Sequence, residues 1–255
     1  MSNAHYWTNK ETRSQLAKTH TQEMDKFYKE EINSCISRSM VIRSISSSKH
    51  TNKPNFLVTE NDSVSEIFAQ DYIKGVVLNF ASYKNPGGGF LKGSSAQEES
   101  LCMDSYLYNV LRNFNDYYEY NQKHLNDGLY TNAAIYTPSV LFFKGDSIKY
   151  CDVLTCASPN FSLSERYGSF TKEENSSVLA DRIKFIRDII DSSDADTAIL
   201  GAWGCGVFRQ DPYEVAKLFK EVFSKTRLTN VVFAIPSSMH SKTNYEAFKE
   251  VFKDE

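Results

Sequence analysis

Residues 85–101 read NPGGGFLKGSSAQEESL, in which three consecutive glycines stand seven residues before a Gln-Glu-Glu triplet. Gly87, Gly88 and Gly89 lack Cβ atoms, so the backbone there can take positive φ angles and let a ligand approach closely. Taken alone, a plain tight turn explains them better. The stretch is neither the Rossmann GxGxxG pattern nor the Walker GxxxxGK[ST] pattern.

The triplet Gln97, Glu98 and Glu99 falls at a predicted helix start. Acidic residues in a first helical turn ordinarily stabilise the helix dipole, and Ser94 or Ser95 would be the N-cap. In isolation this structural interpretation is the simpler one. The combination changes the balance, because a glycine loop that admits a ligand would place it against this helix start and its two carboxylates.

A second glycine-rich loop, GAWGCGVFRQ, occupies residues 201–210 and leads into a predicted helix. Its glycines would free the amides of Cys205, Gly206 and Val207 to face a diphosphate. Phe208 would then offer a flat apolar surface to a ribose or a base. A structural turn that buries the aromatic side chains explains the loop equally well.

Short apolar runs alternate with amphipathic segments, which is typical of an α/β fold with a largely parallel or mixed sheet. Both glycine loops follow predicted strands, and open α/β sheets bind ligands at the carboxyl ends of their strands. Strands are expected at residues 56–59, 75–80, 133–143, 152–157, 197–202 and 230–235. Helices are expected at residues 63–71, 97–113, 115–123, 172–192, 212–224 and 244–252.

The chain is expected to form two parts. Residues 10–45 have a helical pattern, and a polar loop follows from Ser44. We therefore predict a helical N-terminal extension with its loop, residues 1–53, that packs on an α/β domain of residues 54–255. Within that domain, residues 158–170 are expected to form a long loop that serves as a lid or rim.

Composition excludes several classes of function. The 255 residues carry a net charge of only -3 and have no long basic run, which argues against general nucleic-acid binding. The five histidines show no HxH or HExxH spacing and the five cysteines form no CxxC pair. We therefore predict no metal and no cofactor.

The sequence also predicts where the chain resides. An odd number of scattered cysteines is typical of reduced thiols, which indicates a cytoplasmic protein, or a nuclear one if the source is eukaryotic. No apolar run approaches the length of a membrane span, and the N-terminus is polar, unlike a signal sequence. We expect a monomer without membrane partners.

Together these motifs resemble the signature of the poly(ADP-ribose) glycohydrolases, a glycine triplet followed at short spacing by Gln-Glu-Glu. The spacing here, residues 90–96, is seven residues. The order of VLNFASYKNPGGGF, CASPNF and LGAWGCGVF is similar to that of the microbial-type branch of the family. The resemblance covers roughly residues 13–252, although its N-terminal part matches in pattern more than in motif.

The resemblance implies an α/β fold: a three-layer α/β/α macrodomain-like mixed sheet with an N-terminal helical extension. It also implies hydrolysis of the ribose–ribose O-glycosidic bond of poly(ADP-ribose), releasing ADP-ribose. Carried over by position, Glu99 would be the catalytic acid, Glu98 a ribose-anchoring partner that matters for catalysis, and Gln97 a supporting residue. The other implied contacts are Gly87, Gly88, Gly89, Gly204, Cys205, Gly206 and Val207 at the diphosphate, Phe208 at the distal ribose, and Ser82 or Asn85 near its hydroxyls.

The chemistry of glycoside cleavage agrees with these roles. The reaction passes through an oxocarbenium-like state, so it needs a proton donor at the leaving oxygen and nearby negative charge. Glu99 can donate that proton and then accept one from the attacking water. To start protonated, it needs burial and the charge of Glu98 to outweigh the helix N-terminus. The substrate's own diphosphate would supply the negative charge.

Other functions remain open, because any ADP-ribose ligand would fill the same pocket. The partner is therefore an ADP-ribose polymer or an ADP-ribosylated substrate, and a mono-ADP-ribosyl hydrolase acting on nucleic acid or protein is one alternative. A non-catalytic ADP-ribose reader would keep both glycine loops but would not need Glu98 and Glu99 together. A phosphatase acting on ADP-ribose phosphate, the least favoured option, needs no paired carboxylates.

Overall fold

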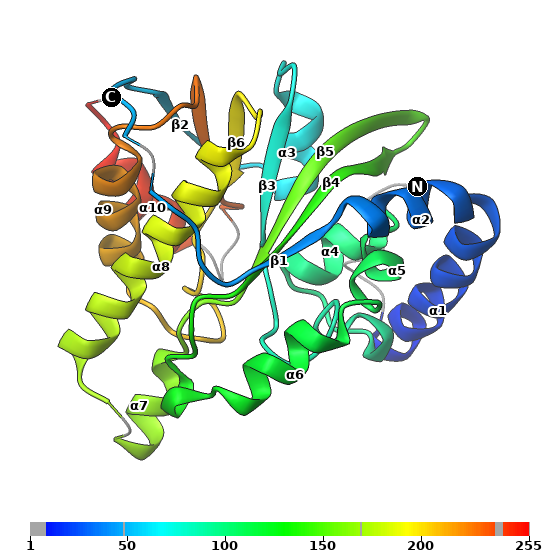
Figure 1. Ribbon diagram of the computed structural model, residues 1–255, viewed down its shortest axis with the longest axis horizontal. Helices are drawn as coiled ribbons and strands as arrows, with labels where there is room; N and C mark the ends of the chain where they lie inside the picture. Colours follow the sequence, from blue (N-terminus) through cyan, green and yellow to red (C-terminus); the bar gives the residue numbers. More distant parts are fainter. Residues whose placement is uncertain (1–8, 48, 169, 238–241, 255) are drawn as a thin grey trace.

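The computed structural model describes residues 9–47, 49–168, 170–237 and 242–254, and its elements surround one seven-stranded sheet (Figure 1). The strands are β1 (Met40–Ile42), β2 (Asn55–Thr59), β3 (Gly75–Phe80), β4 (Ala134–Lys144), β5 (Ser147–Cys156), β6 (Thr197–Leu200) and β7 (Asn230–Ala234). The helices are α1 (Lys10–Phe27), α2 (Lys29–Arg38), α3 (Ser63–Ala69), α4 (Gln97–Met103), α5 (Leu107–Leu111), α6 (Asn115–Lys123), α7 (Phe161–Tyr167), α8 (Lys172–Ser192), α9 (Pro212–Phe223) and α10 (Lys242–Val251), with short 3-10 turns η2 (Phe90–Lys92) and η3 (Asn126–Gly128).

The sheet is mixed, as predicted. Its strand order is β1-β4-β5-β3-β6-β7-β2, and the five strands from β5 to β2 run parallel to one another. β4 is antiparallel to both of its neighbours, β5 and the edge strand β1. The carboxyl ends of β2, β3, β5, β6 and β7 therefore meet at one edge of the sheet.

Helices cover both faces of this sheet (Figure 1). Side chains alternate along β3, so Val76 and Leu78 join the core beneath α8, α9 and α10, whereas Val77 joins the core beneath α1 to α6. The alternation divides the apolar residues into two buried clusters, one on each face. This arrangement confirms the predicted three-layer α/β/α architecture.

Local sequence signals explain where several helices begin. Thr171 and Glu174 form a capping box at the start of α8, each side chain accepting the other residue's N–H. At α9, Asp211 accepts the N–H of Glu214 and Pro212 occupies the first helical position. The predicted bounds of β3, α6 and α8 match the observed ones.

The predicted helical pattern over residues 10–45 is wrong after Arg38. The chain becomes extended at Ser39, and residues 40–42 form β1, an edge strand paired with residues 134–136 of β4. Three residues are too few for an alternating pattern to be recognised. The extension thus contributes to the sheet of the remaining chain, while the division at residue 53 stays a prediction.

The predicted helix over residues 97–113 is interrupted. Ser105 ends α4 by donating its hydroxyl to the carbonyl of Leu101, accepts the N–H of Leu107, and forms a bridge with Phe142. A serine that bonds to neighbouring backbone groups competes with helix hydrogen bonds. The chain therefore turns between α4 and α5.

The predicted long loop over residues 158–170 contains the short helix α7, which ends at Gly168 with φ of 62°. The prediction of an irregular segment is therefore wrong for residues 161–167. The strand predicted at residues 152–157 begins earlier, at Ser147, because it forms a hairpin with β4. Neither α7 nor any other helix in the described ranges has the length and apolarity needed to cross a bilayer.

Candidate active site

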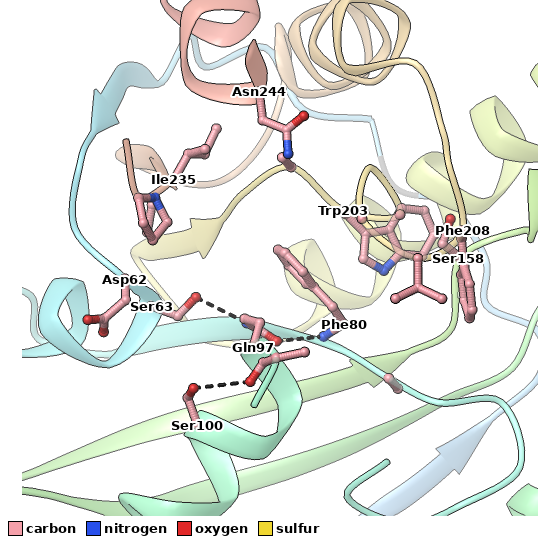
Figure 2. A pocket seen from close by; sticks show the side chains of 18 of the residues that line it. Asp62, Ser63, Phe80, Gln97, Ser100, Ser158, Trp203, Phe208, Ile235 and Asn244 are labelled. Carbon is pink, nitrogen blue, oxygen red and sulfur yellow. Dashed lines mark hydrogen bonds between the residues drawn. The ribbon is translucent and has the colours of Figure 1, made fainter. Parts of the chain in front are cut away.

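A cavity of about 790 Å³ lies at the shared carboxyl edge of the parallel strands (Figure 2). This volume lies within the range of about 300–1,000 Å³ that is typical of small-molecule sites. The segments that follow β2, β3, β5, β6 and β7 each contribute to the wall, together with the first turn of α4 and the start of α10. The lining residues are Asp62, Ser63, Val64, Phe80, Ala81, Ser95, Ala96, Gln97, Ser100, Ser158, Ala202, Trp203, Gly204, Gly206, Val207, Phe208, Ala234, Ile235, Pro236 and Asn244.

The glycine triplet lies directly against the two glutamates. Gly87 and Gly88 have φ angles of 64° and 61°, a backbone conformation that favours glycine. A Cβ at Gly88 would lie 2.7 Å from Oε1 of Glu99 and 2.9 Å from Oε2 of Glu98. The bare backbone is therefore what allows both carboxylates to approach this loop.

Glu98 is buried, with 3% of its surface exposed. Its Oε2 accepts the N–H of Ser82 at 2.7 Å, and its Oε1 accepts the side-chain amide of Asn79 at 3.3 Å. Burial raises the pKa of Glu98 to about 8; the N–H of Ser82 opposes this shift and the charge of Glu99 adds to it. A glutamate that holds a proton near neutral pH thus lies at the end of β3.

Glu99 has 8% of its surface exposed and joins the glycine loop to the helix start. Its Oε1 accepts the N–H of Gly89 at 2.7 Å, and its Oε2 accepts the N–H of Ala96 at 2.9 Å. The N-cap residue is Ala96, so the predicted cap at Ser94 or Ser95 is wrong. Alanine offers no side-chain acceptor, and Glu99 itself satisfies the free N–H of the cap residue.

Gln97 ties the start of α4 to β3. Its Oε1 accepts the N–H of Phe80 at 2.9 Å, while its Nε2 donates to the carbonyl of Leu78 at 2.8 Å. Nε2 also lies 3.1 Å from the hydroxyl of Ser63, which begins α3 (Figure 2). The side-chain amide therefore pairs with β3 as a neighbouring strand would, and it fixes Glu98 and Glu99 relative to the sheet.

The second glycine loop contains a buried structural turn and also contributes residues to the cavity wall. Trp203 is fully buried and donates its indole N–H to the carbonyl of Cys156 at 3.1 Å, as a structural turn requires. Gly204, Val207 and Phe208 nevertheless line the cavity, and Val207 has 83% of its surface exposed. Cys205 is not among the lining residues.

Buried amides fasten this loop to its surroundings. Gln210 exchanges hydrogen bonds of 2.8 and 2.9 Å with Asn175 of α8, and it donates to the carbonyl of Pro159 at 2.9 Å. The N–H of Gln210 also donates to the carbonyl of Gly204 at 3.1 Å. A Cβ at Gly204 would collide with Ser158, so the loops after β5 and β6 are in direct contact.

The structure brings most of the predicted site residues together in two adjoining groups. Gln97, Gly204, Gly206, Val207 and Phe208 line the cavity. The second group adjoins the lining residues and contains Glu98, Glu99, Ser82 and the glycine triplet. Ser82 and Glu98 follow the lining residues Ala81 and Gln97 in the chain. Glu99 accepts the N–H of the lining residue Ala96 and the N–H of Gly89. Asn85 is half-buried and donates its N–H to the hydroxyl of Ser82 at 3.2 Å.

Sequence reasoning missed the wall that follows β2, whereas the stretch after β7, residues 233–248, was expected to contribute to the site. Asp62 and Ser63 follow β2, and Pro236 and Asn244 lie after β7. Ile235, which the sequence placed in the strand core, is buried and also lines the cavity. The available signal was that both strands are parallel to β3, so the residues that follow them reach the same edge.

Within the described residues, His, Cys, Asp and Glu side chains do not gather into any group of three or more that is suited to a metal ion. The polar atoms near the cavity are instead carboxylates, amides and hydroxyls that already take part in hydrogen bonds.

The chain is similar in sequence and structure to known proteins. A family model described as "Microbial-type PARG, catalytic domain" matches residues 1–145. A search of curated protein sequences returned no match. Among solved structures, poly(ADP-ribose) glycohydrolase (PARG) from Thermomonospora curvata is similar, with 26% identity and a TM-score of 0.85 over 95% of this chain and 100% of that one.

Two ligand-bound structures are also similar. The Thermomonospora curvata protein bound to the inhibitor ADP-HPD has 26% identity and a TM-score of 0.82, over 94% of this chain and 99% of that one. The Deinococcus radiodurans protein in complex with ADP-ribose has 26% identity and a TM-score of 0.77, over 87% of this chain and 97% of that one.

Proposed function

The chain belongs to the microbial-type poly(ADP-ribose) glycohydrolases, and from this premise we propose that Glu99 acts as general acid and base in cleaving the ribose–ribose O-glycosidic bond. Family membership makes the chain a poly(ADP-ribose) glycohydrolase. The observation that supports a catalytic role for this pair of glutamates is the close approach of Gly88 to the carboxylates of both Glu98 and Glu99. This contact explains why the glycine triplet and the Gln-Glu-Glu triplet are needed together.

The terminal ADP-ribose of the polymer would occupy the cavity. Its distal ribose would lie at the Gln97 end, near Glu98, Ser82 and Asn85, and Phe208 would pack on it.

The diphosphate would lie between the glycine triplet and Gly204, Gly206 and Val207, where free amides favour an anion. Cys205 belongs to this contact only through its backbone. The adenine would lie toward the apolar wall at Ile235 and Pro236. Solved relatives bound to ADP-ribose and ADP-HPD support this occupancy.

The proposed reaction transfers two protons by way of Glu99, one to the leaving group and one from water. Glu99 donates a proton to the leaving ribose oxygen as the glycosidic bond breaks, and the substrate's diphosphate stabilises the positive charge that develops on the distal ribose. Water then attacks the anomeric carbon, and the carboxylate of Glu99 accepts its proton. Glu98 anchors a hydroxyl of the distal ribose.

A second assignment, with Glu98 as the proton donor, has one observation in its favour. The pKa of Glu98 is raised to about 8, so this residue holds a proton at neutral pH. Glu99, by contrast, accepts two backbone N–H groups. Comparing Glu98→Gln with Glu99→Gln distinguishes the two: the proton donor is the residue whose replacement abolishes cleavage while ADP-ribose still binds.

The function is tested by a panel of substrates given to the purified wild type. We expect release of ADP-ribose from poly(ADP-ribose), and none from a Glu98→Gln/Glu99→Gln double variant. Mono-ADP-ribosylated protein and nucleic acid are assayed beside the polymer. Faster release from either of these would contradict the polymer assignment. Binding of ADP-ribose without release from any substrate would make the protein a reader.

A further inference from the structure

Helix α1 is fastened to the turn that follows the glycine triplet. The Nε–H of Arg13 donates to the carbonyl of Gly93 at 2.8 Å, and the hydroxyl of Ser14 donates to the carbonyl of Leu91 at 2.7 Å. These bonds join residues about 80 positions apart in the sequence. Two carbonyls of one short turn are therefore held by consecutive side chains of a single helix.

The backbone of α1 also touches this turn directly. Gly93 has φ of 75°, and a Cβ there would collide with the carbonyl oxygen of Lys10 and lie 2.9 Å from the backbone nitrogen of Ser14. Such contacts with backbone atoms cannot be relieved by moving a flexible side chain. Gly93 is thus a second glycine that close packing requires, here against the N-terminal helix.

A third contact lies nearly two turns further along α1. The ring of His20 packs edge-on against Phe90, with centroids 6.3 Å apart and planes at 88°. Nε2 of His20 lies 2.7 Å from the carbonyl oxygen of Ser105, at the break between α4 and α5. The first two turns of α1 and His20 therefore contact both the turn and the chain segment that follows α4.

Backbone hydrogen bonds connect this turn to Glu99. The carbonyl of Gly89 accepts the N–H of Lys92 at 2.9 Å and the N–H of Ser94 at 3.1 Å. Both donors flank Gly93, the residue that Arg13 holds. The N–H of the same Gly89 donates to Oε1 of Glu99 at 2.7 Å. Gly89 is therefore fixed on its carbonyl side by the turn and reaches Glu99 through its amide.

We propose that α1 positions the catalytic carboxylate, with Arg13 and Ser14 as positioning residues that act through residues 91–93 and Gly89 on Glu99. This inference rests on the proposed function of Glu99. No residue of α1 lines the cavity in the part of the chain that the structure describes. Loss of these contacts should therefore lower turnover more than it weakens ADP-ribose binding.

The test compares two ways of loosening the same helix. Arg13→Ala/Ser14→Ala removes the bonds to the turn, whereas Arg112→Ala removes the 2.7 Å ion pair with Asp25 near the other end of α1. We expect kcat to fall roughly ten- to a hundredfold in the first variant, since small misplacements of catalytic groups have effects of this size. We expect both kcat and the Kd for ADP-ribose to stay within about twofold of wild type in Arg112→Ala, and the Kd to change less than kcat in Arg13→Ala/Ser14→Ala.

A conservative variant and a readout independent of turnover complete the test. Ser14→Thr keeps the hydroxyl and leaves Arg13 unchanged, so this variant should retain most of the activity. In Arg13→Ala/Ser14→Ala, but not in Arg112→Ala, the Gly89 amide should exchange with solvent deuterium faster than in wild type. Equal kcat in the two variants, or unchanged Gly89 exchange, would overturn the inference. Because exchange needs no substrate, it tests the inference even if wild type hydrolyses nothing.

Discussion

At the scale of single residues, Gly88 is the glycine that lies against both carboxylates of the proposed site. Its positive φ angle alone would disfavour any side chain, but the same is true of Gly145, which has φ of 59° in the β4–β5 turn. The difference is the surroundings. A Cβ at Gly145 would meet no described atom within 4 Å, whereas one at Gly88 would strike both carboxylates.

Gly88→Ala should therefore abolish most of the turnover, by roughly a hundredfold, because it displaces Glu98 and Glu99 from their places beside the glycine loop. Gly145→Ala has similar backbone strain and should keep wild-type kcat and KM. Steady-state kinetics on poly(ADP-ribose), with thermal unfolding of both variants, checks the pair. Equal activity in the two variants would contradict the role given to this contact.

The raised pKa of Glu98 makes stability depend on pH in a defined direction. Folded Glu98 holds its proton up to about pH 8, whereas an ordinary glutamate releases it near pH 4.5. The folded protein therefore binds more protons between these values, and this contribution to stability is lost as the pH rises. Its size is on the order of a few kcal/mol, at about 1.4 kcal/mol per pKa unit.

Glu98→Gln should flatten this decline and make the variant more stable than wild type above about pH 8. Urea unfolding at several pH values between 5 and 9 measures the effect, and Glu221→Gln on the exposed side of α9 serves as the control. An unchanged slope in Glu98→Gln would show that Glu98 is ionised in the folded protein at neutral pH.

The sequence predicted the identities of the central residues better than their contacts. The glycine triplet and Gln-Glu-Glu follow from an unusual local pattern, so both could be found without a structure. Asn79 could not, because it lies in the middle of an apolar strand and its contact with Glu98 spans 19 positions. The cap by Glu99 was missed because a nearby serine is the commoner solution.

At the scale of elements, the loop over residues 201–210 depends on the amide pair between Asn175 and Gln210. Asn175→Leu should leave the buried amide of Gln210 partly unpaired, which typically costs about 1–3 kcal/mol. The loop that faces the proposed diphosphate would loosen. We expect Kd for ADP-ribose to rise by roughly tenfold, with a smaller change in kcat.

Calorimetric titration of ADP-ribose tests this prediction. Tyr213→Phe is the control, because it removes only an exposed hydrogen bond from the first turn of α9 to Glu250. It should bind ADP-ribose as wild type does. A Kd in Asn175→Leu equal to that of the control would show that the loop holds its shape without the amide pair.

Elements with a strong internal pattern could be predicted closely, as β3, α6 and α8 show. The errors arose where a contact distant in sequence decides the local structure. Residues 40–42 are extended because β4 offers an edge with which to pair. The chain breaks after α4 because Ser105 bridges to Phe142 of β4.

At the scale of the whole molecule, the site exists because five parallel strands end at one edge. Sequence patterns predicted six of the seven strands and their mixed character, but not the order β1-β4-β5-β3-β6-β7-β2. Pairing order depends on which apolar faces meet in three dimensions, and a single sequence does not reveal this. The wall formed after β2 was missed for that reason.

The monomeric state, the cytoplasmic location and the division at residue 53 stay predictions from the sequence. The contacts of α1 with residues 90–93 nevertheless predict whether the part after residue 53 is active by itself. If the N-terminal helices position Glu99, a chain that begins at residue 54 should lack full activity even if it folds. The two predicted parts would then form one functional unit.

The most direct measurement compares wild type and Glu99→Gln in two assays: affinity for ADP-ribose, and the single-turnover rate of ADP-ribose release from poly(ADP-ribose). Glutamine keeps one oxygen that can accept the N–H of Gly89 but cannot donate and recover a proton as a carboxylic acid does. We predict a Kd within about twofold of wild type and no detectable release. Release at a rate close to wild type, with ADP-ribose still bound, would contradict the assignment of Glu99 as the catalytic acid and base.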